Sequence, residues 1–458
     1  MTADPVRTKV GPRPPRYLKQ LTHEYRDALS LFLAAFALRL LFALVVSNTY
    51  DYDEFVILLL GRDYARGAVP YVDFSFFHPP GVLVLYRFLS PFTSLWWPLA
   101  RIVTSLIDSI TTVLVLVVGK RIHGSRGGFA AGLIYAFSPL ALVSAVRVGQ
   151  DPLITFLEVA GLSILLTHSS QRAGLLAGMI AGIAIWIKYP AALVLPVYLA
   201  AAPRRTICIL GGTCLAVAVS FGPFLWHARA LYNDTIVFQR NRWEMPALQR
   251  IETAVLYWPA VNVLGLIATA KYRQPPWLLI AFLVGGVFIF SPQIYYHYFV
   301  PTVPFGALLS APLAARLLTV NFKAVVSTLL IVACGWSALL DVGGPSPLFV
   351  TAAHLSDINP TVRILDRITQ KHDPILADRF EYAYLAKRPA ALHYFWNVGV
   401  LVGPRYLERR LAGTAVVVLS SGASSGYPPG FTSFLQRRYP AVRIDSTTLW
   451  LTRRTVSN

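Results

Sequence analysis

The sequence predicts an all-α polytopic membrane protein with a small α/β domain at its C-terminal end. Of its 458 residues, 55% are hydrophobic and only 14% are charged, whereas about a quarter of the residues are charged in a soluble domain. Apolar stretches near 20 residues, long enough to cross a bilayer as helices, recur up to residue 341. Beyond that point short apolar runs alternate with polar segments, as in a soluble α/β fold.

We expect about eleven transmembrane helices, the first of them an uncleaved span. Segment 81–95 is also apolar, but Pro80, Pro91 and Pro98 accompany it, which is typical of a helix lying on the membrane surface. The expected spans are 29–47, 99–118, 127–145, 152–167, 173–187, 189–202, 206–226, 254–270, 276–291, 299–315 and 324–341.

The distribution of basic residues predicts the orientation of these spans. The formal net charge of +19 is spread between the apolar stretches instead of forming one patch, which argues against a nucleic-acid partner. Basic residues cluster in segment 1–28 and in the short loops that follow every second span, so the positive-inside rule places them in the cytoplasm. The membrane domain, 29–341, then has its large first loop, 48–98, on the outer side, together with the extracytoplasmic α/β domain, 342–458.

This topology restricts the kind of substrate. The predicted cytoplasmic loops are too short to fold a nucleotide-binding domain, and the sequence has no glycine-rich phosphate loop. A soluble nucleotide-activated donor is therefore not expected, and a lipid-linked donor in the outer leaflet is the natural source of activated material.

The C-terminal domain is expected to contain strands and helices of ordinary length. The runs 375–377 and 414–419 have the composition of buried strands, and 381–387 has that of a helix. Segment 441–451 alternates apolar and polar residues, which predicts an edge strand.

An acidic segment follows the first span directly. It consists of Tyr50-Asp51-Tyr52-Asp53-Glu54-Phe55, with three carboxylates within four residues. Carboxylates in such a position can accept a proton or bind a metal ion, although a helix leaving a membrane can also simply end in polar residues.

An ordered series of short motifs accompanies the acidic segment. The first loop continues with Tyr64-Ala65-Arg66-Gly67 and His78-Pro79-Pro80-Gly81. Later motifs are, in order, Ala100-Arg101, Ser138-Pro139, Gly149-Gln150-Asp151-Pro152-Leu153, Trp186-Ile187-Lys188-Tyr189-Pro190 and His297-Tyr298-Phe299-Val300-Pro301. Together they resemble the protein O-mannosyltransferase and aminoarabinose-transferase families of the GT-C glycosyltransferases, over most of residues 30–320.

The resemblance implies a GT-C-like membrane domain and a glycosyltransferase in the plasma membrane. Such an enzyme takes a sugar from a polyprenyl phosphate to a cell-envelope glycan, lipid or protein. A transporter or lipid flippase is the alternative, because charged residues occur in mid-span. The absence of an inverted repeat and the one-sided loops argue against transport. A third alternative is a non-catalytic scaffold that presents the C-terminal domain.

The resemblance places the catalytic base in the acidic segment. It implies Asp53 as the base, with Glu54 beside it in the substrate-binding site, and Asp51 competes for the role because the acidic motif is doubled here. A carboxylate within hydrogen-bond reach can take the proton of an acceptor hydroxyl during attack on the sugar. Related sequences often have a second carboxylate one or two positions before the basic residue that precedes the paired prolines, and in this chain those positions are Phe76 and Phe77. Asp73 is the residue that could replace it.

Further site residues are expected at outward turns of the chain. A catalytic or metal-binding role is implied for Asp151, with helix capping as the alternative. Cations that stabilise the leaving phosphate are expected from Arg147, Lys188, His78 and His297, although the two basic residues can also snorkel to lipid headgroups and the histidines can be structural. We expect no metal or other cofactor, because the lipid-monophosphate families mostly work without one.

Three charged residues lie near the middle of predicted spans: Arg39, Asp108 and Glu158. Isolated charges in a bilayer are costly, so we expect them to pair or to face a water-filled cavity. An ion pair between Arg39 and either Asp108 or Glu158 is the simplest prediction.

Overall fold

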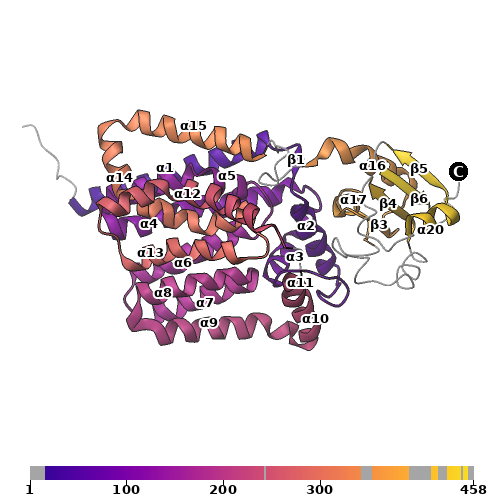
Figure 1. Cartoon of the computed structure of the whole chain (residues 1–458), viewed down its shortest axis with the longest axis horizontal. Coiled ribbons are helices and arrows are strands. Elements are labelled where there is room, and N and C mark those ends of the chain that lie inside the picture. Colours follow the sequence, from indigo (N-terminus) through magenta and orange to yellow (C-terminus); the bar gives the residue numbers. More distant parts are fainter. Residues whose placement is uncertain are drawn as a thin grey trace, which may run out of the picture.

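The structure is a computed structural model in which a bundle of helices carries a smaller α/β unit at one end (Figure 1). It describes residues 16–241, 244–341, 353–390, 414–420, 431–444 and 447–451. Part of the predicted N-terminal segment 1–28 and parts of the predicted domain 342–458 therefore lie outside the described residues.

The helices of the bundle cover the predicted spans. They are α1 (Arg16–Val45), α4 (Pro98–Ala136), α5 (Pro139–Ala145), α6 (Asp151–Thr167), α7 (Gln171–Ile187), α8 (Val194–Ala201), α9 (Thr206–Phe221), α12 (Ala247–Lys271), α13 (Pro276–Gly286), α14 (Val303–Val320) and α15 (Phe322–Asp341). Short helical turns extend several of them, namely η1 (Tyr189–Leu193), η2 (Pro203–Arg205), η3 (Gly222–His227), η5 (Val287–Phe290) and η6 (Tyr296–Thr302).

The apolar helices confirm a multi-pass membrane protein. Four described segments are long and apolar enough to cross a bilayer: Tyr25–Val45, Pro98–Ala136, Pro203–Arg240 and Tyr296–Val320. The second of them, α4, covers two predicted spans. It turns sharply between them at Gly124, whose φ of 74° lies in the left-handed region that glycine tolerates. The total of eleven crossings stays a prediction.

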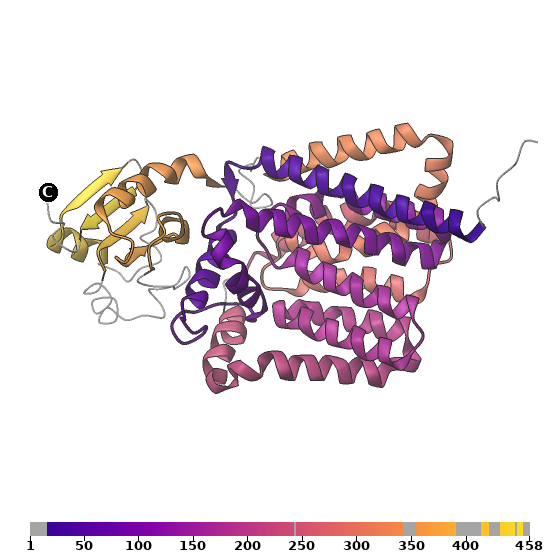
Figure 2. The same cartoon turned by 180° about the vertical axis from the view of Figure 1, so that it is seen from behind.

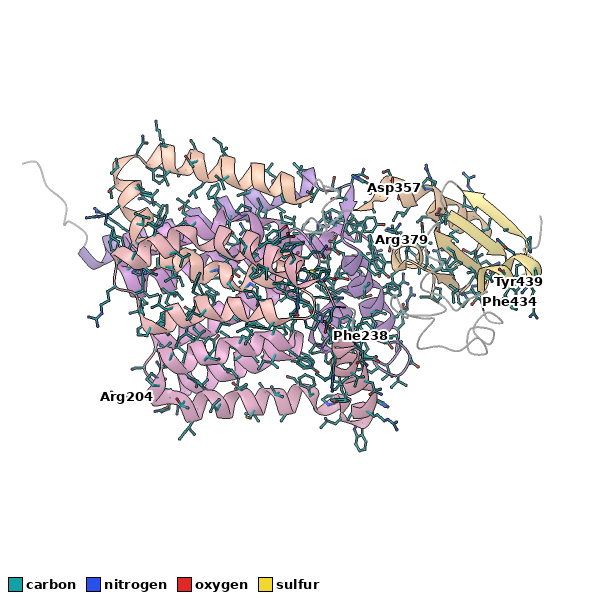
Figure 3. All side chains as sticks on the ribbon, in the orientation of Figure 1. Arg204, Phe238, Asp357, Arg379, Phe434 and Tyr439 are labelled. Carbon is teal, nitrogen blue, oxygen red and sulfur yellow. The ribbon has the colours of Figure 1, made fainter. Side chains whose placement is uncertain are left out.

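The two ends of the bundle differ as the predicted topology requires. Arg204, in a predicted cytoplasmic loop, lies at the end away from the α/β unit, whereas Phe238, in a predicted outer loop, lies at the end next to it (Figure 3). Helix α1 also begins at the end away from the α/β unit (Figure 2). Loops predicted to share a side therefore lie at one end, and which end faces the cytoplasm stays a prediction.

Short helices cover the end of the bundle that faces the α/β unit. Helices α2 (Tyr52–Ala65) and α3 (Gly81–Thr93) follow strand β1 (Thr49–Tyr50), and α10 (Ala228–Tyr232), the π-helical turn η4 (Asn233–Val237) and α11 (Phe238–Arg240) lie beside them. Helix α3 and the residues after it expose a row of apolar side chains, namely Phe88, Phe92, Leu95 and Trp96. The helix predicted over 81–95 is therefore present, with the apolar face that a surface helix needs.

The α/β unit contains a four-stranded sheet. Its described elements are β2 (Ala353–His354), α16 (Leu355–Ile368), β3 (Ile375–Ala377), α17 (Phe380–Leu385), β4 (Val416–Ser420), α20 (Phe431–Arg438), β5 (Ala441–Ile444) and β6 (Thr447–Leu451). The strand order is β3-β4-β6-β5, with β3 and β4 parallel and the other pairs antiparallel. We call these described residues the C-terminal unit.

One strand prediction in this unit is wrong. Segment 441–451 is two strands, and β6 lies inside the sheet between β4 and β5. Ile444 pairs with Thr447 at one end of the antiparallel β5–β6 ladder. Four consecutive polar residues, 445–448, interrupt the alternation, and this interruption marks the boundary between the two strands.

A buried ion pair joins two helices of the bundle. The Arg39 side chain on α1 donates from Nε to Asp108 Oδ2 on α4 at 2.6 Å, and the Tyr135 hydroxyl donates to the other carboxylate oxygen. Arg39 and Asp108 are fully buried. The predicted pairing of Arg39 is therefore confirmed with Asp108, while Glu158 lies elsewhere.

Removing one partner of this pair is expected to destabilise the bundle. Asp108→Leu leaves the Arg39 guanidinium buried without a counter-charge, which costs about 3–5 kcal/mol. Thermal unfolding in detergent should show a clearly lowered Tm for Asp108→Leu, and the double variant Arg39→Leu/Asp108→Leu should recover much of the loss. Equal stability of wild type and Asp108→Leu would contradict this account.

Candidate functional site

Glu54 organises the segment that follows the first span. Its carboxylate accepts two hydrogen bonds from the Arg101 guanidinium, at 2.9 and 2.7 Å, and one from the Val148 backbone N–H at 2.9 Å. Arg147 lies 3.4 Å from the same carboxylate. Burial alone would raise the pKa of Glu54, but the Arg101 and Arg147 guanidiniums outweigh it and hold that pKa below its usual range. Glu54 is therefore an ionised structural anchor, and its oxygens are committed to the protein.

Arg147 and Arg101 also hold the backbone just before the acidic segment. Arg147 donates to the Thr49 carbonyl at 2.8 Å and to the Thr49 hydroxyl at 2.7 Å. Arg101 donates to the carbonyls of Val46 and Thr49 at 3.2 and 2.6 Å. Helix α4 and the turn between α5 and α6 thus fix the chain where it passes from α1 into α2.

Asp51 and Asp53 have different surroundings. Asp51 is the N-cap of α2: its Oδ1 accepts from the Asp53 backbone N–H at 3.0 Å, and its own N–H donates to Glu54 Oε2 at 2.9 Å, which completes a capping box. Asp51 is half-buried, whereas the side chain of Asp53 is exposed. Asp51 therefore shares the polar cluster of Glu54, while Asp53 lies on the solvent side of the first turn.

The environment of Asp51 favours its neutral form. Burial raises the pKa of Asp51 above its usual value, and the nearby Glu54 carboxylate adds to the effect. The hydrogen bond from the Asp53 N–H and the charges of Arg147 and Arg101 act in the opposite direction without cancelling it. A carboxylate with a raised pKa is a stronger base once ionised.

Asp151 and Lys188 form a second polar pair. Lys188, at the C-terminal end of α7, donates from Nζ to Asp151 Oδ1 at 2.7 Å, at the start of α6. The Lys188 ammonium also lies 5.1 Å from the centroid of the Tyr298 ring. Both charged side chains are largely buried, with 8% and 10% of their surface exposed for Lys188 and Asp151 respectively. Asp151 thus orients Lys188 besides sitting at a helix N-terminus.

The pair lies at the polar end of an apolar pocket. The pocket is partly open and lies between α6, α8, α13 and the η6–α14 segment. Its charged lining residues are Asp151, Glu158 and Lys188, and the remaining lining is mainly aliphatic and aromatic: Ile154, Pro190, Leu193, Val194, Val197, Ala281, Val284, Phe288, Tyr298, Pro301, Thr302 and Phe305. A pocket with a Lys188–Asp151 pair at one end and mainly apolar walls suits an amphipathic ligand.

Tyr296 links the two polar groups. Its side chain is buried and lies within electrostatic reach of Asp51, Arg147 and Asp151. The structure therefore brings together Asp51, Glu54, Arg147, Asp151 and Lys188 from the predicted site.

The two predicted histidines occupy different positions. The ring of His297 packs among Tyr295, Tyr296 and Tyr298, with centroid distances of 5.6, 5.5 and 5.0 Å. It therefore lies next to Tyr298, the ring that the Lys188 ammonium contacts. His78 is held through its backbone, because the Tyr71 hydroxyl donates to its carbonyl at 2.7 Å. Asp73, the candidate second carboxylate, accepts from the Val69 N–H at 2.7 Å in a local turn.

Sequence reasoning missed two members of the cluster. Arg101 is present in one of the motifs but not among the predicted site residues, and Tyr296 is in neither. An arginine at the beginning of a membrane helix needs a buried counter-charge or water, and that rule could have pointed to Glu54. Among the described residues, no group of three or more His, Cys, Asp and Glu side chains is placed to hold a metal ion.

The chain resembles known glycosyltransferases in sequence and in structure. A sequence profile of dolichyl-phosphate-mannose-protein mannosyltransferases matches residues 78–227. A search of curated protein sequences gives no match.

Two solved proteins share the fold. ArnT from Cupriavidus metallidurans, bound to undecaprenyl phosphate, superposes with a TM-score of 0.64 at 14% identity, over 96% of this chain and 99% of that one. The archaeal oligosaccharyltransferase AglB from Archaeoglobus fulgidus, in complex with an inhibitory peptide and a dolichol-phosphate, gives a TM-score of 0.54 at 10% identity, over 97% of this chain and 75% of that one. The resemblance predicted from the ordered motifs is confirmed.

Proposed function

We propose that this GT-C-type glycosyltransferase takes a sugar from a polyprenyl-phosphate donor to a hydroxyl of an extracytoplasmic acceptor. The observation that carries the proposal is the apolar pocket whose polar end is the Lys188–Asp151 pair, within reach of the cluster around Asp51. The acceptor class is a cell-envelope glycan, lipid or protein, and the membrane is the plasma membrane. Segment 1–28 then lies in the cytoplasm and residues 342–458 form an extracytoplasmic domain.

The pocket is assigned to the lipid carrier. An isoprenoid chain is apolar and gains by contact with side chains such as Val194, Val197 and Phe288. Its phosphate is an anion, so it belongs at the end where Lys188 supplies an ammonium group. His297 packs against Tyr298, which lines the pocket, and Arg147 lies within electrostatic reach of the neighbouring Tyr296.

Asp51 is assigned as the base in preference to Asp53. Asp51 faces the buried polar cluster and Asp53 faces solvent. In the proposed step the ionised Asp51 takes the acceptor proton while the acceptor oxygen bonds to the sugar C1. The bond between C1 and the phosphate oxygen breaks, and the lipid phosphate leaves with the electron pair, stabilised by Lys188. Asp151 orients Lys188, and Glu54 holds the loop.

A transporter or lipid flippase would use the same pocket without a base. The capping box, the two arginines and the buried Tyr296 around Asp51 support chemistry at the outer end instead, because transport needs no carboxylate with a raised pKa at that position.

A donor panel separates the two functions. The full chain in lipid nanodiscs is incubated with radiolabelled polyprenyl-phosphate sugars and with extracts of cell-envelope glycan, lipid and protein. We expect label to move from lipid to one extract with wild type and not with Asp51→Asn. Uptake of label by proteoliposomes without any transfer product would overturn the assignment in favour of transport.

A further inference from the structure

We propose that the C-terminal unit positions the base, through Tyr50 and its partners Glu381 and Arg379. This inference rests on the proposed function for the role of Asp51. It adds a task for the C-terminal unit, which supplies none of the residues assigned to the reaction above.

The three side chains form a closed polar triad across the junction. The Tyr50 hydroxyl donates to Glu381 Oε1 at 2.7 Å, and Arg379 donates to the Tyr50 hydroxyl at 3.0 Å. Arg379 Nε lies 2.8 Å from the same Glu381 oxygen. Tyr50 and Glu381 are fully buried. The triad therefore sets the position of the residue directly before Asp51.

Backbone pairing fixes the same segment. Strand β1 pairs antiparallel with β2, with Thr49 opposite His354 and Tyr50 opposite Ala353. The Leu355 N–H donates to the Asn48 carbonyl at 2.8 Å. The chain thus enters the catalytic segment as a strand of a sheet shared with the C-terminal unit.

The opposite side of the segment is held by the bundle. Arg101 and Arg147 bind the carbonyl oxygen of Thr49, and Arg101 also binds that of Val46. Segment 46–50 is therefore held on one side by the bundle and on the other by the C-terminal unit, an arrangement that we call the clamp. Asp51, the N-cap of α2, follows this segment directly. The bundle binds Val46 and Thr49, whereas the C-terminal unit binds Asn48, Thr49 and Tyr50.

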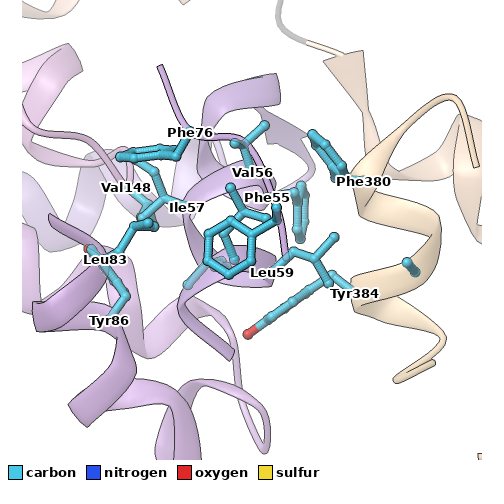
Figure 4. Packing of buried hydrophobic residues seen from close by; sticks show 14 of the residues in the cluster. Phe55, Val56, Ile57, Leu59, Phe76, Leu83, Tyr86, Val148, Phe380 and Tyr384 are labelled. Carbon is cyan, nitrogen blue, oxygen red and sulfur yellow. The ribbon is translucent and has the colours of Figure 1, made fainter. Parts of the chain in front are cut away.

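The polar residues of the triad indicate that the contact positions the acidic segment, and does not only hold the bundle and the C-terminal unit together. Apolar contacts already join the two parts, because Phe55, Val56 and Leu59 of α2 pack with Phe380 and Tyr384 in one buried cluster (Figure 4). A buried carboxylate adds little net stability to such a contact, since its desolvation opposes the gain from pairing. A buried polar triad with fixed geometry instead selects one arrangement of the contact. Arg379 itself lies on the side of the C-terminal unit that faces the bundle (Figure 3).

The same junction offers a matched control. The Tyr384 hydroxyl donates to the Thr93 carbonyl at 2.9 Å, also in a buried contact between the C-terminal unit and the bundle. That bond reaches the end of α3 and not the acidic segment. Tyr50→Phe and Tyr384→Phe therefore each remove one buried hydroxyl from the same junction. Only Tyr50 is next to Asp51.

Hydrogen–deuterium exchange and kinetics test the inference on the full chain in nanodiscs. For Tyr50→Phe we expect amide exchange at residues 51–54 to rise about tenfold or more, and kcat to fall by up to about 10²-fold, the usual size of a misplacement effect. Binding of undecaprenyl phosphate should change less than about twofold, because the pocket is untouched. The acid limb of the pH–kcat profile should move to lower pH, since Asp51 loses part of the burial that raises its pKa.

Tyr384→Phe should lower Tm about as much as Tyr50→Phe does. It should leave the exchange at residues 51–54, kcat, undecaprenyl phosphate binding and the pH–kcat profile unchanged. Glu381→Gln, which keeps an acceptor for Tyr50, should retain more activity than Glu381→Leu. Equal exchange at 51–54 in Tyr50→Phe and wild type, or equal effects of the two tyrosine variants on kcat and exchange, would overturn the inference. If wild type transfers no sugar from any donor, the proposed function fails, and the exchange comparison still decides whether the clamp exists.

Discussion

Asp51→Asn is expected to lower kcat by about 10²- to 10⁴-fold, the usual contribution of a general base. The substitution removes the ionisable oxygen but keeps an amide oxygen that can cap α2, since asparagine is as good an N-cap as aspartate. Folding and donor binding should therefore be preserved. Radiolabel transfer gives kcat, while thermal unfolding and undecaprenyl phosphate binding serve as the checks on integrity.

The pH profile adds a second readout of the same assignment. A base works only when ionised, so activity should be lost as the pH falls through the pKa of Asp51. Burial raises that pKa, and the acid limb should therefore lie above the pH at which an exposed aspartate titrates. Residual activity of Asp51→Asn should lack this limb.

Asp53→Asn is the matched control. Its side chain is exposed and only its backbone N–H serves the cap, so we expect kcat within a few-fold of wild type. Loss of activity in Asp53→Asn together with retention in Asp51→Asn would return the role of the base to Asp53, as the resemblance first implied.

Hydropathy predicted the helices of the bundle well because lipid leaves few alternatives. A backbone in hydrocarbon must satisfy its hydrogen bonds internally, so an apolar stretch of membrane length becomes a helix. The same constraint predicted a partner for Arg39, since an unpaired charge in the bundle is costly. The choice of Asp108 over Glu158 needed the packing of α1 against α4.

The site was predictable as a region and not as a set of contacts. Asp51 and Asp53 are two residues apart in the sequence, which corresponds to about half a turn of a helix. Asp51 therefore faces the polar cluster and Asp53 faces solvent. The spacing of Asp51 and Glu54 is the signature of a capping box, which would have identified Asp51 as the N-cap and Glu54 as its partner. The arginines that hold Glu54 come from positions 101 and 147 and meet only in the fold. For the same reason, nothing in the sequence indicates that Tyr50 contacts Glu381.

Lys188→Met should lower kcat by about 10²- to 10³-fold, as expected when a donor that stabilises developing charge is removed. The phosphate gains negative charge as the sugar leaves, so an ammonium group at Lys188 helps the transition state more than the bound donor. Lys188→Arg keeps the charge and should retain more activity than Lys188→Met. Transfer kinetics and the affinity for undecaprenyl phosphate measure the two parts of the effect.

Asp151 complicates the interpretation, because Lys188→Met leaves its carboxylate largely buried without a partner. The double variant Lys188→Met/Asp151→Asn removes that penalty and should regain stability without regaining kcat. Asp151→Asn alone frees the ammonium from a 2.7 Å ion pair and removes an anion beside the phosphate, so undecaprenyl phosphate should bind more tightly. Weaker binding in Asp151→Asn would mean that the orientation of Lys188 matters more than the competition for its charge. Wild-type kcat in the double variant would show that the phosphate leaves elsewhere.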